Sequence, residues 1–198
     1  PDGTIKIWGN YLPNQFTPAE WNYNTFNFFI NITFVSFAEI AITNTAFDLY
    51  HTGKFSNVDR AICFRIRPIK EGKYWPAVVI GSNDALTTYG LFGVASFNKY
   101  FGSNYLALIK HLDFAGNILG FHAAYNIPVS TSSQQKFPIS GGVSFTPRFY
   151  KDLNVIAEYD TKSFNIGANI IVFKYLYFQF LLNQFRYPVA GFQFQFTI

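Results

Sequence analysis

The chain has 198 residues, of which 13% are charged and 21% are aromatic, including 25 Phe and 13 Tyr. A soluble domain carries about twice that share of charged residues, so the composition disfavours a water-soluble globular protein. The net charge of +4 comes without a cluster of Lys and Arg, and it gives no indication of nucleic-acid binding.

The chain is also too polar for helical membrane spans. Mean hydropathy is +0.11, and no run approaches the roughly 18 apolar residues that a transmembrane helix needs. The single Cys63 excludes an internal disulfide and a cysteine-based metal site, and we expect it to be a small lumen-facing or buried residue. From the start at Pro1 and the absence of Met we expect a processed or trimmed chain, in which the signal peptide that an outer-membrane protein requires would have been lost upstream.

Extended segments follow one another along the whole chain, marked by alternation, β-rich composition and intervening turn residues. We place them at 4–11, 23–34, 36–46, 58–67, 75–82, 103–112, 117–126, 138–146, 153–160, 163–173, 175–185 and 188–197. Strands of about ten residues with one polar face suit a barrel wall. The predicted fold class is therefore all-β: a transmembrane antiparallel β-barrel of about 12 strands, one domain over residues 1–198, in a Gram-negative outer membrane.

The connections suggest an orientation. An even number of strands puts both termini on the periplasmic side, where outer-membrane barrels keep their short turns. Counted from there, the long connections 13–21, 47–58 and 83–103 are extracellular, and the short turns near Val35, at 113–116 and near Lys174 are periplasmic. Two connections are exceptions: the turn at 160–162 is tight although it lies on the outer side, and the turn at 147–152 is of moderate length although it lies on the periplasmic side. The apolar 83–103 connection needs a cover, either a partner protein or the lumen itself.

Aromatic residues gather near the predicted strand ends, as expected of girdles at the headgroup level. Those near the outer end are Tyr11, Trp21, Tyr23, Tyr105, Phe185 and Tyr187. Those near the inner end are Trp8, Tyr74, Trp75, Phe149, Tyr150, Tyr175 and Tyr177.

The final segment has the clearest alternation. Phe192, Phe194 and Phe196 point one way, and Gln193 and Gln195 point the other. An aromatic-rich terminal strand of this kind is typical of the closing strand and export signal of an outer-membrane barrel, with the Phe residues against lipid. The alternative for this stretch alone is an edge strand of a soluble sandwich.

Several short motifs then resemble the YjbH-like outer-membrane proteins. Residues 74–84 are similar to that family's Y-x-P-A-x-x-x-G-x-x-D segment, and 103–110 to its following strand. Residues 140–143 and 153–160 are similar to GGV and L-x-x-x-x-E-Y-D, with Asn165 and Gly167 after them, and 1–4 to P-D-G-T. Residues 87–90 depart from the family's Gly-Thr-Gly. The resemblance implies an outer-membrane barrel associated with exopolysaccharide production or export.

Alternation also selects the side chains that point inward. In 58–67, Ile62, Phe64 and Ile66 share the lipid face, which turns Arg65 and Arg67 into the lumen. The charged residues expected in the lumen are Lys6, Glu39, Arg65, Arg67, Lys110, Glu158 and Asp160. His122 and the amides Asn165, Asn169, Gln193 and Gln195 are also expected to point inward.

Strand direction fixes the depth of these charges. With the 47–58 connection centred near residue 52, Glu39 falls opposite residues 65–67, which predicts a cross-strand contact with Arg65 or Arg67. Glu158 and Asp160 fall near the outer end and should not reach the arginines. The lumen then has a basic inner mouth and an acidic outer wall, a field that attracts anionic solutes. The alternative is an interior of ion pairs and amides that fills a narrow barrel.

Sequence motifs for chemistry are missing. Of the three histidines, His51, His111 and His122, none begins a His-x-Ser pair, although a base and a nucleophile can still meet in space. No metal or phosphate-loop motif is present, and we expect no cofactor. The sequence therefore predicts a non-enzymatic barrel that contacts outer-membrane lipid, acts with other envelope proteins in export or assembly, and handles anionic polysaccharide. The alternative is a passive, porin-like narrow channel that favours anionic solutes.

Overall fold

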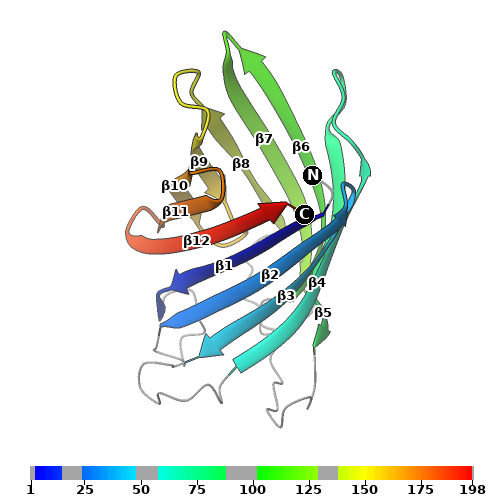
Figure 1. The fold of residues 1–198 in the computed structure, drawn as a ribbon, viewed down its shortest axis with the longest axis vertical. Helices are drawn as coiled ribbons and strands as arrows, with labels where there is room; N and C mark the ends of the chain where they lie inside the picture. The colour runs from blue at the N-terminus through cyan, green and yellow to red at the C-terminus, as the bar shows by residue number, and fades with distance from the viewer. Residues whose placement is uncertain (1–2, 15–23, 48–57, 88–101, 129–137, 198) are drawn as a thin grey trace.

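A computed structural model describes residues 3–14, 24–47, 58–87, 102–128 and 138–197 of the chain. These residues form β1 (Thr4–Leu12), β2 (Thr25–Val35), β3 (Ala38–Phe47), β4 (Val58–Ile69), β5 (Ala77–Thr87), β6 (Ser103–Phe114), β7 (Asn117–Pro128), β8 (Ile139–Thr146), β9 (Leu153–Tyr159), β10 (Phe164–Val172), β11 (Leu176–Asn183) and β12 (Tyr187–Thr197). Each strand pairs antiparallel with its neighbours in sequence, and β12 pairs with β1 to close the sheet (Figure 1). The predicted twelve-stranded antiparallel barrel is confirmed.

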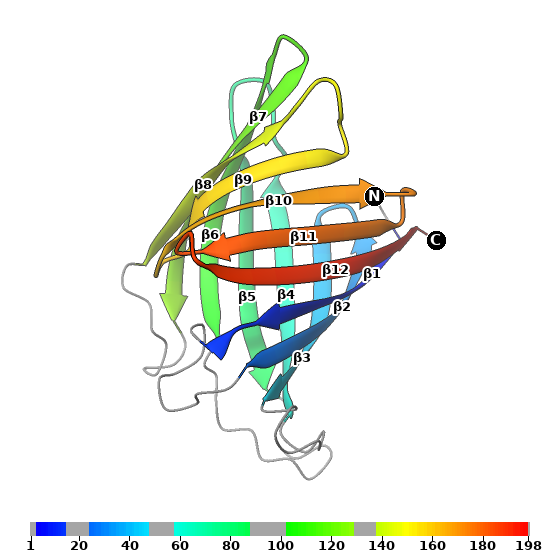
Figure 2. The same cartoon turned by 90° about the vertical axis from the view of Figure 1, so that its left-hand side faces the viewer.

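The two walls of the barrel cross one another. In Figure 2, β10, β11 and β12 run across the view in front of β4 and β5, which run along the long axis. This crossing follows from closure, because the strands of a barrel tilt by about 35–45° to its axis.

Both ends of the described chain meet at one end of the barrel, since Thr4 is the register partner of Thr197. The turns at this end are short, namely 36–37, 70–76, 115–116, 147–152 and 173–175. Outer-membrane barrels keep their short turns on the periplasmic side, so we call this the periplasmic end. The connections at the opposite end include 160–163 and 184–186, which are tight. The connections expected at 13–21, 47–58 and 83–103 lie largely outside the described residues, as do Trp21, Tyr23 and His51.

The outer surface is apolar around the barrel. Phe192, Phe194 and Phe196 are 40%, 42% and 48% exposed on the outer face, as the alternation of the last strand predicts. A closed sheet leaves no unpaired edge inside a bilayer, and an apolar band on its exterior matches the acyl chains. The protein is an outer-membrane β-barrel. No helix in the described part of the chain has the length and apolar character to cross a membrane.

In two of the hairpins, non-glycine residues with positive φ occupy both central positions of the turn. Phe173 and Lys174 have φ of 54° and 66°, and Gln184 and Phe185 have 53° and 58°. Positive φ at both central residues is the signature of the type I′ turn, whose twist matches that of the flanking strands. The strands themselves differ from the prediction mainly at β5, which continues to Thr87 beyond the expected end at residue 82.

Candidate functional site

The predicted contact between Glu39 and Arg65 is present. They are register partners on β3 and β4, and Arg65 Nη2 donates to Glu39 Oε2 over 2.9 Å. Alternation on β3 turns Glu39 inward because Ile40 and Ile42, each 44% exposed, occupy the outer face. The hairpin register and the apolar pattern together determine this ion pair.

The Glu39 carboxylate also accepts hydrogen bonds from β2. Asn31 Nδ2 donates to Oε1 over 3.2 Å, and Thr33 Oγ1 donates to Oε2 over 3.3 Å. Trp8 Nε1 in turn donates to Asn31 Oδ1 over 3.1 Å, so a polar chain runs from β1 to β4 along the inner wall. Lys6 has the same inward parity as Trp8 and is the register partner of Asn31.

Arg67 lies one inward position nearer the periplasmic end. Its Nη2 donates to the Ser36 carbonyl over 2.7 Å, and its backbone N–H donates to the Phe37 carbonyl over 2.7 Å, which fix it against the β2–β3 turn. Its Nε is buried and has no hydrogen-bond partner among the residues that the structure describes. A buried guanidinium N–H without an acceptor favours an anion beside it.

A cavity of about 710 Å³ opens at this end of the lumen, and we call it the periplasmic vestibule. The charged and titratable residues that line it are Glu39, Arg65, Arg67, Lys70, Glu71, His111 and His122. Each carboxylate there has a cationic partner: Glu39 pairs with Arg65, and Glu71 with Lys110 and His111. Within the described ranges no carboxylate pairs with Arg67 or Lys70, so the vestibule carries positive charge that its own acids do not balance.

A second cavity of about 200 Å³, the middle cavity, lies deeper in the lumen and shares three lining residues with the vestibule: Glu39, Arg65 and Tyr105. These three residues lie where the two spaces adjoin, and we call them the partition. Tyr105 reaches this position because its register partner is Gly81, where an added Cβ would lie 2.3 Å from Tyr105 Oη. Cys63 lines the middle cavity as well, and its Sγ accepts a hydrogen bond from the Asp84 backbone N–H over 3.4 Å.

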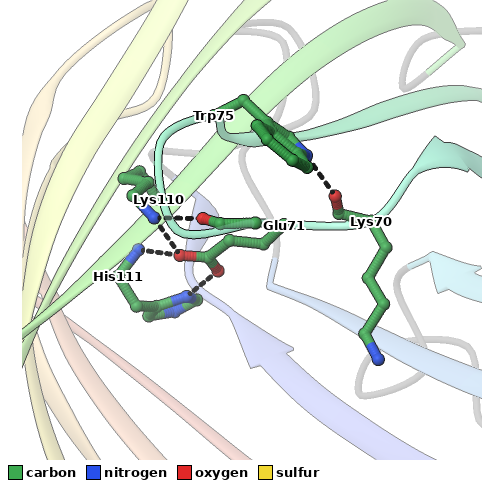
Figure 3. A network of polar contacts seen from close by, with 6 residues as sticks. Lys70, Glu71, Trp75, Lys110 and His111 are labelled. Atoms are coloured by element: carbon green, nitrogen blue, oxygen red, sulfur yellow. Dashed lines mark hydrogen bonds and ion pairs between the residues drawn. The ribbon is translucent and has the colours of Figure 1, made fainter.

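The β4–β5 turn places Glu71 against β6 (Figure 3). Glu71 Oε1 accepts from Lys110 Nζ over 3.1 Å and from the His111 backbone N–H over 2.7 Å, and Oε2 lies 2.7 Å from His111 Nδ1. Hydrogen bonds from the His111 ring and backbone, and then from Lys110, lower the pKa of Glu71 to about 2. The Lys70 side chain points away from Glu71, Lys110 and His111 (Figure 3). Lys70 lines the vestibule.

The prediction that Lys110 points into the lumen is wrong. Tyr105, Ala107, Ile109 and His111 line the vestibule, so residue 110 falls on the outer parity of β6, and its amine returns to the Gly72 carbonyl and Glu71. The alternation rule assigned the wrong face because segment 103–112 has apolar residues at both its odd and its even positions. His122 does face the vestibule as expected, and His111, which the pattern had not singled out, joins it.

Glu158 and Asp160 line a third pocket of about 170 Å³ together with Asn10, Asn165 and Gln179. Asp160 Oδ1 accepts from the backbone N–H groups of Lys162 and Ser163, which explains why the β9–β10 turn is tight on the outer side. Asn165 Nδ2 donates to Asp160 Oδ2 over 3.0 Å. No ion pair joins either acid to Arg65 or Arg67 in the described part of the barrel.

Three aromatics predicted for the headgroup girdles lie inside instead. Trp8 and Tyr105 line the middle cavity, and Tyr177 shares the inward parity of Gln179, which lines the third pocket. Trp8 stacks on Phe29 with ring centroids 4.0 Å apart, so these rings fill the lumen. Residues in the turns follow the prediction better: Tyr74 and Phe149 are 81% and 87% exposed.

The described residues contain no group of three or more His, Cys, Asp or Glu side chains that could hold a metal ion. Lys, Arg, Glu and His side chains around a solvent-open cavity are instead suited to binding an anion or to moving protons.

Comparison with known proteins yields structural likeness only. No protein-family model and no curated sequence matches the chain. Among solved structures, outer membrane phospholipase A from Escherichia coli matches with a TM-score of 0.40 and 9% identity over 98% of this chain and 95% of that chain. The calcium-bound dimer of the Salmonella typhi outer membrane phospholipase matches with a TM-score of 0.38 and 10% identity over 97% of this chain and 88% of that chain.

This finding corrects one prediction. The sequence predicts a non-enzymatic barrel, whereas the solved barrels that match are phospholipases, which are enzymes. The expectation that the protein is not an enzyme is therefore withdrawn. Likeness at this identity shows no activity of this chain.

Proposed function

We propose that the protein binds anionic solutes or acidic sugar residues in its periplasmic vestibule and passes them through the outer membrane. The observation that carries this proposal is the pair Arg67 and Lys70, which line the vestibule without a carboxylate partner among the described residues. A low-dielectric wall around unbalanced cations concentrates anions from solution.

The partition of Glu39, Arg65 and Tyr105 sets the limit on passage. An anion that has passed Arg67 and Lys70 meets Arg65 at the partition, where the guanidinium is paired with Glu39. Passage into the middle cavity requires these side chains to move aside. We therefore expect a small conductance with anion preference.

The test is the reversal potential of the refolded barrel in a planar bilayer under a salt gradient. Arg67→Ala/Lys70→Ala should reduce the preference for chloride over potassium. The matched control is Lys73→Ala/Lys174→Ala, which removes the same charge from turns at the same end, outside the vestibule lining. Equal selectivity in wild type and the Arg67/Lys70 variant, or an equal loss in the control, would refute the vestibule as the selective element.

A second candidate role is as a subunit of an envelope export or assembly complex, in line with the resemblance to exopolysaccharide-associated YjbH-like barrels. The β6–β7 hairpin favours it. Strand β5 pairs with β6 only as far as Ile109, so the hairpin tip projects beyond β5 (Figure 1). Leu112 and Phe114 on this tip are 48% and 74% exposed.

A photocrosslinking amino acid at Phe114, in cells that make the protein naturally, tests this role. A specific protein adduct is expected at Phe114 and not at Phe173, a control position that is 83% exposed in another turn of the same end. Equal crosslinking at both positions would indicate general contact with the surroundings and would reject the hairpin as a docking surface.

A further inference from the structure

We propose that Glu71, His111 and Ser144 form an acid–base–nucleophile set at the edge of the periplasmic vestibule that hydrolyses carboxylic esters. The proposal goes beyond solute binding and does not depend on it. It rests on three side chains that lie far apart in the sequence and that the barrel register brings into one row.

The register supplies the row. His111 on β6 is the partner of Gly120 on β7, and Gly120 is the partner of Ser144 on β8. All three positions have the lumen-facing parity, since His111 lines the vestibule and Gly120 and Ser144 follow in the same row across the sheet. A large side chain at position 120 on β7, the middle strand, would separate His111 from Ser144.

Glycine at the middle position removes that barrier. A Cβ built on Gly120 would lie 2.4 Å from Ser144 Oγ, 3.2 Å from His111 Cδ2 and 3.5 Å from His111 Nε2. The hydroxyl and the Nε2 edge of the imidazole therefore approach the same point above Gly120 from opposite sides. This glycine has ordinary strand backbone, so the space it leaves, and not its conformational freedom, is the feature that matters.

The other edge of the imidazole faces the acid. Glu71 Oε2 lies 2.7 Å from His111 Nδ1, and Oε1 is held by Lys110 Nζ and by the His111 backbone N–H. A carboxylate on Nδ1 stabilises the tautomer with hydrogen on Nδ1, which leaves the Nε2 lone pair toward the hydroxyl. Carboxylate, imidazole and hydroxyl thus stand in the order that general-base activation of serine requires.

The reaction follows from this order. Ser144 Oγ attacks the ester carbonyl carbon as its proton passes to His111 Nε2. The tetrahedral adduct collapses, the C–O bond to the alcohol breaks, and the alcohol leaves with the proton from Nε2. Water then attacks the acyl-serine, gives its proton to Nε2, and the acid departs as Oγ recovers that proton. No redox partner is needed, and Glu71 acts by positioning and stabilising the imidazolium.

The surroundings define the substrate class. Arg67 and Lys70 line the same cavity as Glu71 and His111, so an ester that carries negative charge, such as an acylated acidic sugar, is favoured over a neutral one. The cavity of about 710 Å³ has room for a small acyl group and part of a sugar.

The experiment uses the full refolded chain, a fluorophosphonate probe for activated serines, and hydrolysis of p-nitrophenyl acetate and of the anionic ester mono-p-nitrophenyl succinate. We expect labelling at Ser144 and ester turnover, with the anionic ester preferred. Ser144→Ala and His111→Gln should each lower turnover by about a hundredfold or more. Glu71→Gln should lower kcat and leave KM nearly unchanged, a split that loss of structure would not produce.

The matched control is Ser140→Ala, on the same face of the same strand, where Asn126 Nδ2 donates to Ser140 Oγ. It should keep full turnover and labelling. Circular dichroism and resistance to trypsin confirm that each variant is folded. The proposal is overturned if folded wild type shows neither labelling nor turnover above buffer, or if Ser144→Ala and Ser140→Ala behave alike.

Discussion

Glu39 and Arg65 meet as register partners across β3 and β4, and the guanidinium donates to the carboxylate over 2.9 Å. The two side chains differ in exposure, 12% for Glu39 and 48% for Arg65. The Glu39 carboxylate accepts from three donors on the two neighbouring strands, Asn31, Thr33 and Arg65. Much of the Arg65 side chain, in contrast, remains in contact with lumen water.

The first prediction is the energetic coupling of this pair. A double-mutant cycle of Glu39→Gln and Arg65→Gln, read by urea unfolding in detergent, should give a coupling free energy of about 0.5–1 kcal/mol, because an ion pair with a half-exposed partner is screened. Glu39→Gln alone should raise anion selectivity, since Arg65 then lacks its counter-charge. Additive single variants with unchanged selectivity would mean that the pair is not populated in solution.

Local rules accounted for this pair because its geometry is local. One hairpin connects Glu39 and Arg65, and alternation on both strands is marked by Ile40, Ile42 and Phe64 on the outer face. The same rule failed at Lys110, because β6 has apolar residues on both parities and only the pairing with β5 and β7 settles which face is inside.

Contacts that depend on the whole barrel could not be predicted from the sequence. Glu71 binds His111 through a turn, and Ser144 approaches His111 across an intervening strand. Trp8 and Tyr105 were assigned to the membrane interface because aromatics at strand ends favour it, but a barrel of this size also needs bulky groups to fill its lumen.

The second prediction concerns acid. Glu71 has a folded-state pKa of about 2 against an ordinary value of 4.5, so it contributes stability that is fully present above pH 4.5 and is lost as the pH falls toward 2. The β4–β5 turn should therefore detach from β6 between these pH values. Trp75 reports on it, because its Nε1 donates to the Lys70 carbonyl within the turn.

The measurement is a fluorescence titration of a Trp8→Phe/Trp21→Phe variant, in which Trp75 is the only tryptophan of the chain. A transition between pH 4.5 and 2 should appear, and Glu71→Gln should abolish it by removing the group that titrates. A transition that survives in Glu71→Gln would assign it to another group.

The third prediction tests the partition. Gly81→Ala places a Cβ 2.3 Å from the Tyr105 phenol, so the ring must move, at a cost of about 1–3 kcal/mol. In a Tyr105→Ala background the same change should cost less than about 1 kcal/mol, because the overlapping group is gone. Urea unfolding of the four proteins gives both values, and equal costs in the two backgrounds would show that Tyr105 does not rest on Gly81.

The last prediction is a stabilising change at the β10–β11 turn. Phe173 and Lys174 both hold positive φ, which L-residues adopt at a cost, and Asn-Gly is the preferred pair for such a turn. Phe173→Asn/Lys174→Gly should raise the free energy of unfolding by about 1 kcal/mol. Lys151→Gly is the control, because the same type of residue in the β8–β9 turn has no positive φ, and glycine there should be neutral or destabilising. A loss of stability in the Asn-Gly variant would show that the Phe173 side chain contributes more through its contact with the membrane than the turn loses through its backbone.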